Sequence, residues 1–374
     1  MPLSLPWEWS ADIQRQTALS LARKGHTVRV FMANDGAFWF NQLLRGFRTQ
    51  HPDADQHLVF YQPVFIFPPS KIESLNRLNY LVALRIFKWW VSFRATFPKV
   101  LWLCGLEFYE LPDFFVGWKS LYYCSDYFAF EEIPTAASRE REEMETKTFQ
   151  RVDLAFVNSH ILHELHKKKR QLLSIVSQGF CISDFHHRDK VPSIKRAGRF
   201  LIGYVGGISD RIDWKLVTRL VKEHPEWDFA FYYPSSNGPR NSREFPKIMN
   251  RKNVIHGTTR DRRELAALIE QFDIGMIPYG STRPFNYYCF PMKIYEYFYF
   301  GIPVISTKNA ELLRFTDLVK VTDSYDAWVE WIRRIETKGW PLGKQREEKR
   351  QSRLRGWDRQ VGMMLKEIEK TLSR

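Results

Sequence analysis

The sequence predicts an α/β protein with two domains, each built on a parallel β-sheet. The chain has 374 residues, about twice the length of a typical domain. Short apolar segments alternate with longer amphipathic ones along most of it, as strands and helices do in parallel sheets. Hydrophobic residues make up 44% of the composition, which is enough for two buried cores and too much for a disordered chain.

The first half of the chain has the pattern of a parallel α/β domain. A helix is expected over about residues 11–24, and a charged helix over 139–150. The helix and strand within residues 11–31 normally follow a first strand in a doubly wound sheet. Few residues precede them, so either residues 2–6 supply a short first strand or the chain starts late relative to its relatives. The predicted strands are 27–31, 57–61, 99–103, 120–124 and 154–159.

Residues 77–97 predict a basic, aromatic, amphipathic helix. At 100° per residue, Arg77, Arg85 and Lys88 fall on one face. Such a helix is a candidate for lying in the interface of an anionic membrane. An ordinary helix with its aromatic side chains in the core is an equally good interpretation. The aromatic members are Phe87, Trp89, Trp90 and Phe93.

The second half predicts another α/β domain after a polar, basic linker at 186–196. An apolar strand starting at Phe200 leads into the turn Gly206-Gly207, and Arg211 follows near the start of a helix. Glycines at such a turn let a ligand approach the backbone, although every doubly wound fold needs tight turns there. Further elements are expected at 227–233, 253–257 and 274–279 (strands), 262–271 (a helix) and 344–374 (one long charged helix).

Residues 290–307 predict a short helix followed by a buried strand. Pro291 can start the helix, Gly301 suits a left-handed C-cap, and the proline that follows prevents continuation. Lys293 and Glu296 are three residues apart and therefore share one face of the first turns. This pattern suits a phosphorylated nucleoside, because the helix dipole and the lysine attract phosphate and the carboxylate can accept from ribose hydroxyls. A surface helix with a weak ion pair is the plain alternative.

Composition narrows the class of protein. The net charge of +14 favours an anionic partner such as nucleic acid, anionic lipid or a phosphorylated substrate. The four cysteines lack paired spacing, which indicates reduced thiols in a cytoplasmic protein and no metal site. No run of about 18 apolar residues predicts a membrane span, and the first ten residues lack the regions of a signal peptide. No nucleic-acid motif occurs and the basic residues are dispersed, so nucleic acid is not an expected partner.

Three motifs of the second half, taken in order, resemble the donor-binding half of GT-B glycosyltransferases. The similar enzymes are the bacterial ones that build exopolysaccharides and other cell-surface glycans. The motifs are residues 202–206 with Arg211 and Asp213, residues 273–279, and residues 291–293 with Glu296, Tyr297 and 301–304. Residues 14–30, 153–159 and 357–359 also resemble segments of this family, so the resemblance covers nearly the whole chain.

The resemblance implies two Rossmann-like domains with parallel sheets that face one another across a cleft. They would be an acceptor-binding domain, 1–190, and a nucleotide-sugar-binding domain, 198–345. Residues 346–374 would form a C-terminal helix that packs back on the first domain.

The implied function is a glycosyltransferase of the hexosyltransferase type, working on the cytoplasmic side and peripheral to the membrane. It would move a sugar from a nucleoside-diphosphate sugar, most simply a UDP-sugar, to a lipid-linked or polysaccharide acceptor, with no metal or other cofactor. The implied donor-binding residues are Gly206, Gly207, Arg211, Tyr279, Met292, Lys293, Tyr295 and Glu296.

The catalytic carboxylate is expected in the first domain. Retaining members of the related large family often carry a second glutamate eight positions before the ribose-binding one, and this position is Tyr288 here. Similar inverting enzymes use a carboxylate base from the first domain to deprotonate the acceptor hydroxyl. Asp126, just past a strand end, is the leading candidate, and Glu8, Asp12 and Glu107 are rivals. A structural Asp126 that caps a helix is the alternative.

Two other functions fit the same pattern. A nucleotide-sugar epimerase of this fold would need no acceptor. A degenerate relative would bind nucleotide sugars or partner proteins without catalysis.

Overall fold

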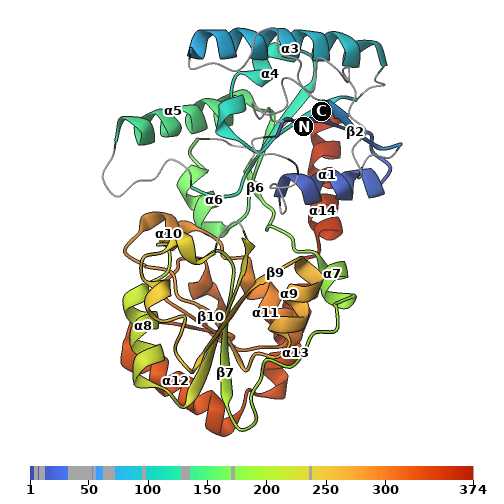
Figure 1. The fold of residues 1–374 in the computed structure, drawn as a ribbon. Helices are drawn as coiled ribbons and strands as arrows, with labels where there is room; N and C mark the ends of the chain where they lie inside the picture. Colours follow the sequence, from blue (N-terminus) through green and yellow to red (C-terminus); the bar gives the residue numbers. More distant parts are fainter. Residues whose placement is uncertain are drawn as a thin grey trace. The chain divides into compact units, whose positions relative to one another are not determined.

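The chain folds as an α/β protein with two compact units (Figure 1). The computed structural model describes residues 1–3, 7, 13–32, 53, 56–61, 72–94, 98–127, 135–169, 173–235 and 238–373. The first unit comprises the described residues up to Gly179 together with residues 357–373. The second comprises residues 180–356. The predicted fold class is confirmed, because all strand pairs in the sheets are parallel.

The described residues of the first unit contain two parallel sheets. One pairs β1 with β2, and the other has the order β3-β4-β5-β6. The strands are β1 (Val28–Phe31), β2 (Leu58–Tyr61), β3 (Val100–Leu103), β4 (Lys119–Cys124), β5 (Leu154–Val157) and β6 (Leu173–Ile175). The five strands expected from the sequence are all present, and β6 is an addition. Its three residues are half-buried and too few to show a period.

A short segment at the start of the chain lies beside β1. The amide of Leu3 donates to the carbonyl of Phe31 at 2.9 Å, and the amide of Phe31 donates to the carbonyl of Met1 at 2.9 Å. Pro2 forms a parallel bridge with Phe31. Residues 1–3 therefore form a short parallel segment beside β1, which agrees with one of the two alternatives drawn from the sequence, a short first strand within 2–6; residues 4–6 lie outside the described part of the chain.

Helix α14 (Trp357–Leu372) packs on α1 (Ile13–Arg23) within the first unit (Figure 1). Asp358 accepts hydrogen bonds from the Ser20 hydroxyl at 2.6 Å and from the Arg23 guanidinium at 2.8 Å. The other helices in the described part of this unit are α3 (Glu73–Arg94), η2 (Leu106–Phe108), α4 (Leu111–Phe114), α5 (Ala136–Arg151) and α6 (His160–His166). None of the helices in the described part of the chain combines the length and apolar composition that crossing a bilayer requires.

The prediction of one long C-terminal helix is wrong. Residues 342–353 form α13, which packs on α11 in the second unit, and α14 begins only at Trp357. Between them Gly356 makes a parallel bridge with Phe180, whose amide donates to the Arg355 carbonyl at 3.0 Å. A backbone that pairs sideways in this way cannot also continue the hydrogen bonds of a helix.

One six-stranded parallel sheet forms the second unit, in the order β12-β11-β10-β7-β8-β9. Its strands are β7 (Phe200–Val205), β8 (Trp227–Pro234), β9 (Val254–Thr259), β10 (Ile274–Ile277), β11 (Val304–Ser306) and β12 (Val319–Val321). Its α-helices are α7 (Ile182–His186), α8 (Trp214–Glu223), α9 (Arg262–Ile269), α10 (Pro284–Tyr288), α11 (Lys293–Phe300), α12 (Tyr325–Lys338) and α13 (Leu342–Arg353), and its 3-10 helices are η4 (Pro239–Asn241), η5 (Phe245–Lys247) and η6 (Leu312–Phe315). The four inner strands, β7, β8, β10 and β11, are almost wholly buried, as expected for a sheet covered on both faces, whereas the edge strands β9 and β12 are partly exposed.

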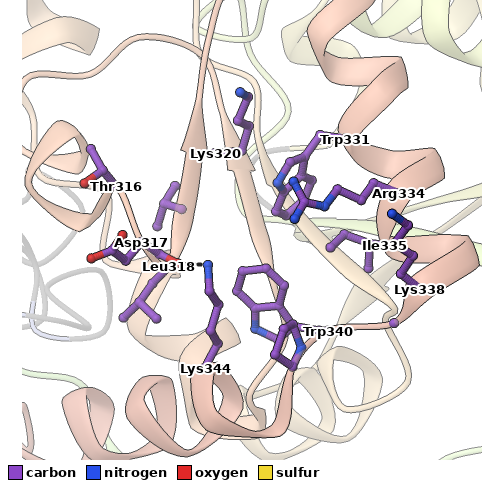
Figure 2. Close-up of a pocket in the computed structure, with 13 residues that line it drawn as sticks. Thr316, Asp317, Leu318, Lys320, Trp331, Arg334, Ile335, Lys338, Trp340 and Lys344 are labelled. Atoms are coloured by element: carbon purple, nitrogen blue, oxygen red, sulfur yellow. Dashed lines mark hydrogen bonds between the residues drawn. The ribbon is translucent and has the colours of Figure 1, made fainter.

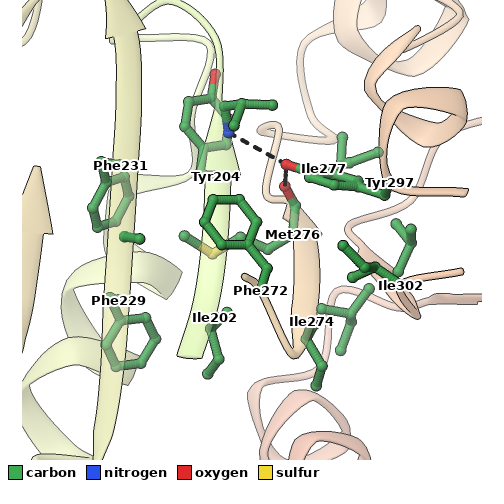
Figure 3. Close-up of a cluster of buried hydrophobic side chains, with 14 of the residues drawn as sticks. Ile202, Tyr204, Phe229, Phe231, Phe272, Ile274, Met276, Ile277, Tyr297 and Ile302 are labelled. Atoms are coloured by element: carbon green, nitrogen blue, oxygen red, sulfur yellow. Dashed lines mark hydrogen bonds between the residues drawn. The ribbon is translucent and has the colours of Figure 1, made fainter. Parts of the chain in front are cut away.

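Two glycines in neighbouring strands let aromatic rings lie directly on this sheet (Figure 3). A Cβ atom on Gly203 would lie 2.0 Å from the Phe272 ring, and one on Gly275 would lie 2.5 Å from the Tyr297 ring. The Tyr297 hydroxyl accepts from the Val205 amide at 3.3 Å. This close packing fixes α11, which begins at Lys293, against β7 and β10.

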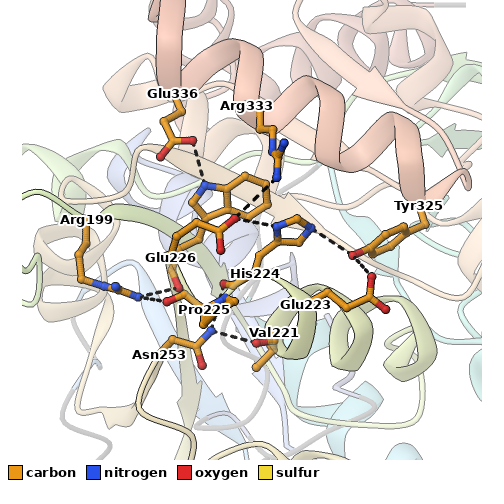
Figure 4. Close-up of polar contacts among 11 residues, drawn as sticks. Arg199, Val221, Glu223, His224, Pro225, Glu226, Asn253, Tyr325, Arg333 and Glu336 are labelled. Atoms are coloured by element: carbon orange, nitrogen blue, oxygen red, sulfur yellow. Dashed lines mark hydrogen bonds and ion pairs between the residues drawn. The ribbon is translucent and has the colours of Figure 1, made fainter.

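A polar cluster fastens α12 to the start of β8 (Figure 4). The His224 ring stacks on Trp227 with 4.3 Å between centroids and hydrogen-bonds to the Tyr325 hydroxyl at 3.1 Å. The Trp227 indole donates to Glu336 at 3.0 Å. Because Tyr325 and Glu336 lie near opposite ends of α12, the helix is fixed along its length.

Candidate functional site

The turn after β7 and the first residue of α11 meet at the carboxyl ends of the strands. Gly206 has φ +126°, a conformation that residues with a Cβ rarely adopt. A Cβ here would lie 2.6 Å from Cε and 2.7 Å from Nζ of Lys293. Glycine is therefore required both by the backbone and by the path of the lysine side chain.

Lys293 is held between two tyrosines. Its ammonium donates to the Tyr279 hydroxyl at 2.5 Å and lies 5.3 Å from the ring centre of Tyr204. Burial alone would lower the pKa of Lys293, but the Tyr279 and Tyr204 hydroxyls and the Glu296 carboxylate outweigh burial and raise it. The lysine is therefore a fixed positive charge at neutral pH.

Arg211 brings a second cation to the same edge of the sheet. Its guanidinium lies between the rings of Tyr279 and Phe285, at 4.8 and 4.7 Å from their centres. Nε donates to Asn286 at 2.9 Å, and the Asn286 amide donates back to the Arg211 carbonyl at 3.0 Å. The loops after β7 and β10 are thus tied together. Sequence reasoning missed Asn286 and Phe285, since neither belongs to a motif and only the fold brings them to Arg211.

Glu296 has a partner that the sequence did not reveal. The residue is 7% exposed, and its carboxylate accepts from the Arg262 guanidinium at 2.8 Å. Arg262 begins α9 and also lies 3.9 Å from a carboxylate oxygen of Asp184. The helix of Arg262 was predicted, but nothing in its spacing pointed to Glu296. One oxygen of Glu296 is therefore engaged in an ion pair, and a carboxylate keeps further acceptor capacity.

The remaining donor-site candidates lie in different surroundings. Gly207 accepts at its carbonyl from the Tyr204 hydroxyl at 2.9 Å, which fixes the turn, and Met292 is half-buried at the N-cap of α11. Tyr295 is fully buried and packs edge-on against Phe290, 5.7 Å between centroids. The expectation that Tyr295 flanks a donor is corrected: its ring belongs to the core, on the side of α11 that faces away from solvent.

Asp126 lies two residues beyond β4 in the first unit and is half-buried. The Cys124 thiol donates to the Asp126 backbone carbonyl at 3.4 Å. Of the rivals, Glu107 is exposed on η2, and Glu8 and Asp12 lie outside the described residues.

A buried polar cluster supports the strand end that carries Asp126. Glu145, on α5, lies 4.0 Å from the Cys124 sulfur, 3.6 Å from His166 and 3.3 Å from Lys169. Burial raises the pKa of Glu145 to about 7, and burial with the Lys169 charge lowers the pKa of His166 to about 3. His166 is therefore a neutral ring at neutral pH, and Lys169 is the cation beside Glu145.

The comparison with known proteins agrees with this architecture. A scan against models of protein families found no match. Over 170 residues the chain is 28% identical to TuaH of Bacillus subtilis (strain 168), whose suggested role is that of a teichuronic acid biosynthesis glycosyltransferase. The aligned region covers 44% of this chain and 42% of that protein, so the chain matches less than half of its relative's length.

Solved structures extend the likeness over the whole fold. The α,α-trehalose 6-phosphate synthase of Burkholderia multivorans covers 100% of this chain and 97% of its own, with a TM-score of 0.65 and 11% identity. The pneumococcal O-GlcNAc transferase GtfA, solved with UDP and GlcNAc, matches over 78% of this chain and 60% of its own, with a TM-score of 0.54 and 13% identity. A Listeria monocytogenes protein described as a UDP-N-acetylglucosamine 2-epimerase matches over 96% of this chain and 92% of its own, with a TM-score of 0.56 and 11% identity. The chain has the fold of the GT-B glycosyltransferases.

Proposed function

We propose that the chain is a glycosyltransferase of cell-surface glycan synthesis that uses a nucleoside-diphosphate sugar. The observation that carries the proposal is the pair of cations, Lys293 and Arg211, around the Gly206 turn. In parallel α/β sheets, ligands bind at the carboxyl ends of the strands, where this pair lies. The partial match to TuaH supports a surface-glycan acceptor, either lipid-linked or a polysaccharide. The UDP named for two neighbours of the same fold supports a UDP-sugar donor.

The donor's diphosphate would lie against Lys293 and Arg211, at the N-terminal end of α11. Two fixed positive charges would stabilise the negative charge that develops on the leaving diphosphate. We propose that these two side chains provide this stabilisation without a bound metal. Glu296 would accept from the ribose through the oxygen that Arg262 leaves free. Tyr279, which contacts both cations, would border the same space.

Asp126 would act as the general base on the acceptor. It would take the proton of the acceptor hydroxyl while that oxygen attacks the anomeric carbon and the bond to the diphosphate breaks. An aspartate with backbone fixed at a strand end can hold the orientation that proton transfer needs. Tyr288, in place of a second glutamate, favours this route over one that uses a carboxylate from the second unit.

Product analysis tests the reaction class. The full chain is incubated with labelled UDP-sugars, with and without a lipid extract containing polyprenyl-linked glycans. Transfer of label to the extract only when the enzyme is present supports the proposal. Appearance of an isomeric UDP-sugar without acceptor identifies an epimerase instead, and no conversion under either condition identifies a binding protein.

We also propose that α3 lies on an anionic membrane surface. Trp89 is 63% exposed, and Leu78 and Ile86 lie with it on one face of the helix, each more than 40% exposed. The opposite face packs in the core, where Phe87 lies 5.1 Å from the ring of Phe31. Arg85 is exposed on the outer face. The side chains of Arg77, Trp90, Phe93 and Arg94, and residues 95–97, lie outside the described part of the chain.

Flotation with vesicles tests this surface. We expect the chain to float with phosphatidylglycerol-containing vesicles and not with pure phosphatidylcholine, because the protein carries a net charge of +14. Trp89→Glu should reduce flotation, whereas Leu313→Glu, at a 44% exposed residue of the second unit, should not. Equal flotation of both variants would place the contact elsewhere on the molecule.

A further inference from the structure

A hollow lies in the second unit, at the edge strand β12 (Figure 2). It has a volume of about 260 Å³ and sits between the amino end of β12, the end of α12 and the turn into α13. The Gly206 turn follows the carboxyl end of β7, so this hollow lies at the opposite edge of the same parallel sheet. The residues that carry the argument are Lys320, Trp331, Arg334, Lys338, Trp340 and Lys344.

Two indole rings form the apolar part of this pocket. The Trp331 and Trp340 rings lie 5.9 Å apart between centroids at an interplanar angle of 63°. Trp340 is fixed in place, because its Nε1 donates to both carboxylate oxygens of Glu348 at 3.0 Å and Lys344 lies 4.8 Å from its ring centre. Both rings are only half-buried. Fixed, partly exposed indoles offer flat apolar faces to a ring-shaped ligand.

The side chains around the Trp331 and Trp340 rings carry an excess of positive charge. Lys320, Arg334 and Lys338 line the pocket, and none of them forms an ion pair with a carboxylate in the described part of the chain. Lys344 donates to the backbone carbonyl of Asp317 at 2.6 Å, which leaves its charge uncompensated by that contact. Asp317 supplies the one acidic side chain among the lining residues. Among the lining residues, four cations therefore stand against one carboxylate. Glu348 adds a second carboxyl group behind Trp340, but burial raises its pKa to about 8, so the positive excess remains and suits an anionic ligand.

We propose that this pocket binds a carbohydrate segment that carries carboxylate or phosphate groups. The indole faces would stack on the apolar faces of a sugar ring, and the cations would pair with its anionic substituents. The volume admits about one sugar ring, and the open side lets a longer chain pass. The inference rests on the proposed function, for which the pocket would hold the acceptor glycan at a place other than the donor site.

Binding measurements with oligosaccharides of equal length test the proposal. The full chain is titrated by calorimetry with tetragalacturonate, which carries a carboxylate on each ring, and with the neutral maltotetraose. We expect binding of the first and at least about tenfold weaker binding of the second, with an affinity that falls as salt is raised. Equal affinity for the two, no binding of either, or full competition by equimolar inorganic phosphate would overturn the proposal.

Variants place the binding in this pocket. Lys338→Gln, at an exposed position that leaves folding intact, and Trp331→Leu should each weaken tetragalacturonate binding, whereas Lys222→Ala on α8 should not. Unchanged binding in both pocket variants would overturn the assignment. Tighter binding of an oligothymidylate of equal charge would overturn it in favour of a nucleic-acid surface.

The failure of this proposal can be told apart from failure of the proposed function. Both pocket variants should keep the thermal stabilisation by UDP, because the donor site lies at the other edge of the sheet. If the wild-type chain binds tetragalacturonate but is not stabilised by UDP, the glycosyltransferase function is rejected and the anionic-glycan site is kept.

Discussion

The two units differ in how they are assembled from the chain. Within the described residues the second is a single stretch, 180–356, and its donor-site candidates run from Gly206 to Glu296. The first is discontinuous, because α14 returns to it from the end of the chain. The parts of the second unit's site, a glycine turn and a helix start, are local features visible in the sequence, and the fold then brings Gly206 and Lys293 together. The first depends on pairings between distant segments, such as Ser20 with Asp358, that leave no local pattern.

The largest effect is expected from a variant that separates catalysis, which we assign to the first unit, from donor binding, which we assign to the second. Asp126→Asn keeps the shape of the side chain and removes its basicity, so we expect transfer to fall at least about a hundredfold while UDP binding is unchanged. The assay is label transfer to a lipid-linked acceptor, run beside UDP calorimetry. Glu107→Gln, at an exposed rival, is the control and should keep its activity. Normal turnover of Asp126→Asn would remove the base role from this residue.

Gly206→Ala tests whether the turn after β7 positions Lys293 for UDP binding in the second unit. The substitution forces a Cβ into a backbone with φ +126° and onto the Lys293 side chain, at an expected cost of about 1–3 kcal/mol in the free energy of unfolding. UDP affinity should fall with it, since the ammonium must move. Gly343→Ala, where a Cβ meets nothing within 4 Å and φ is not positive, is the matched control. Wild-type UDP affinity in Gly206→Ala would show that Lys293 does not need this turn.

The pH dependence of stability should carry a signature of the second unit. Burial raises the pKa of Glu348 to about 8, although the Trp340 hydrogen bond opposes the shift. A carboxyl whose pKa is higher in the folded state stabilises below its unfolded value near 4.5 and loses that contribution as pH rises to 8. Denaturant unfolding of the wild type should therefore lose up to about 1.4 kcal/mol per pH unit over this window relative to Glu348→Gln. Parallel pH profiles for the two proteins would contradict the shift.

The smallest effect is expected where α14 meets α1 in the first unit. Burial alone would raise the pKa of Asp358, but Arg23 and Ser20 more than offset it and lower that pKa. Because both side chains of the ion pair are more than half exposed, Asp358→Asn should cost only about 0.5–1 kcal/mol of unfolding free energy. Urea unfolding at pH 7 measures it, with Glu369→Gln on the same helix as control. A loss above about 2 kcal/mol would mean that this contact anchors the helix more strongly than its exposure suggests.

The predictability of the fold follows the same division. Strand positions and the C-cap at Gly301, with φ +73°, could be predicted because short apolar segments and single glycines are local signals. The break between α13 and α14 was not, because it depends on the bridge from Gly356 to Phe180. At the site, Lys293 and Arg211 were predicted, but the Arg262 partner of Glu296 was not. Tyr295 was misplaced because helical spacing gives no sign that Phe290 and Phe315 cover its face of the helix.

Thermal stabilisation by UDP tests the central claim, a nucleotide site built on Lys293 and Glu296, most directly. A ligand at about a hundred times its dissociation constant stabilises a folded protein by about 2.7 kcal/mol, which a thermal-shift assay detects readily. We expect UDP to raise the melting temperature of the wild type and of Lys215→Ala, an exposed lysine on α8. Lys293→Ala and Glu296→Ala should remain folded and show no such rise. Undiminished stabilisation in both of these variants would contradict the assignment of the donor site.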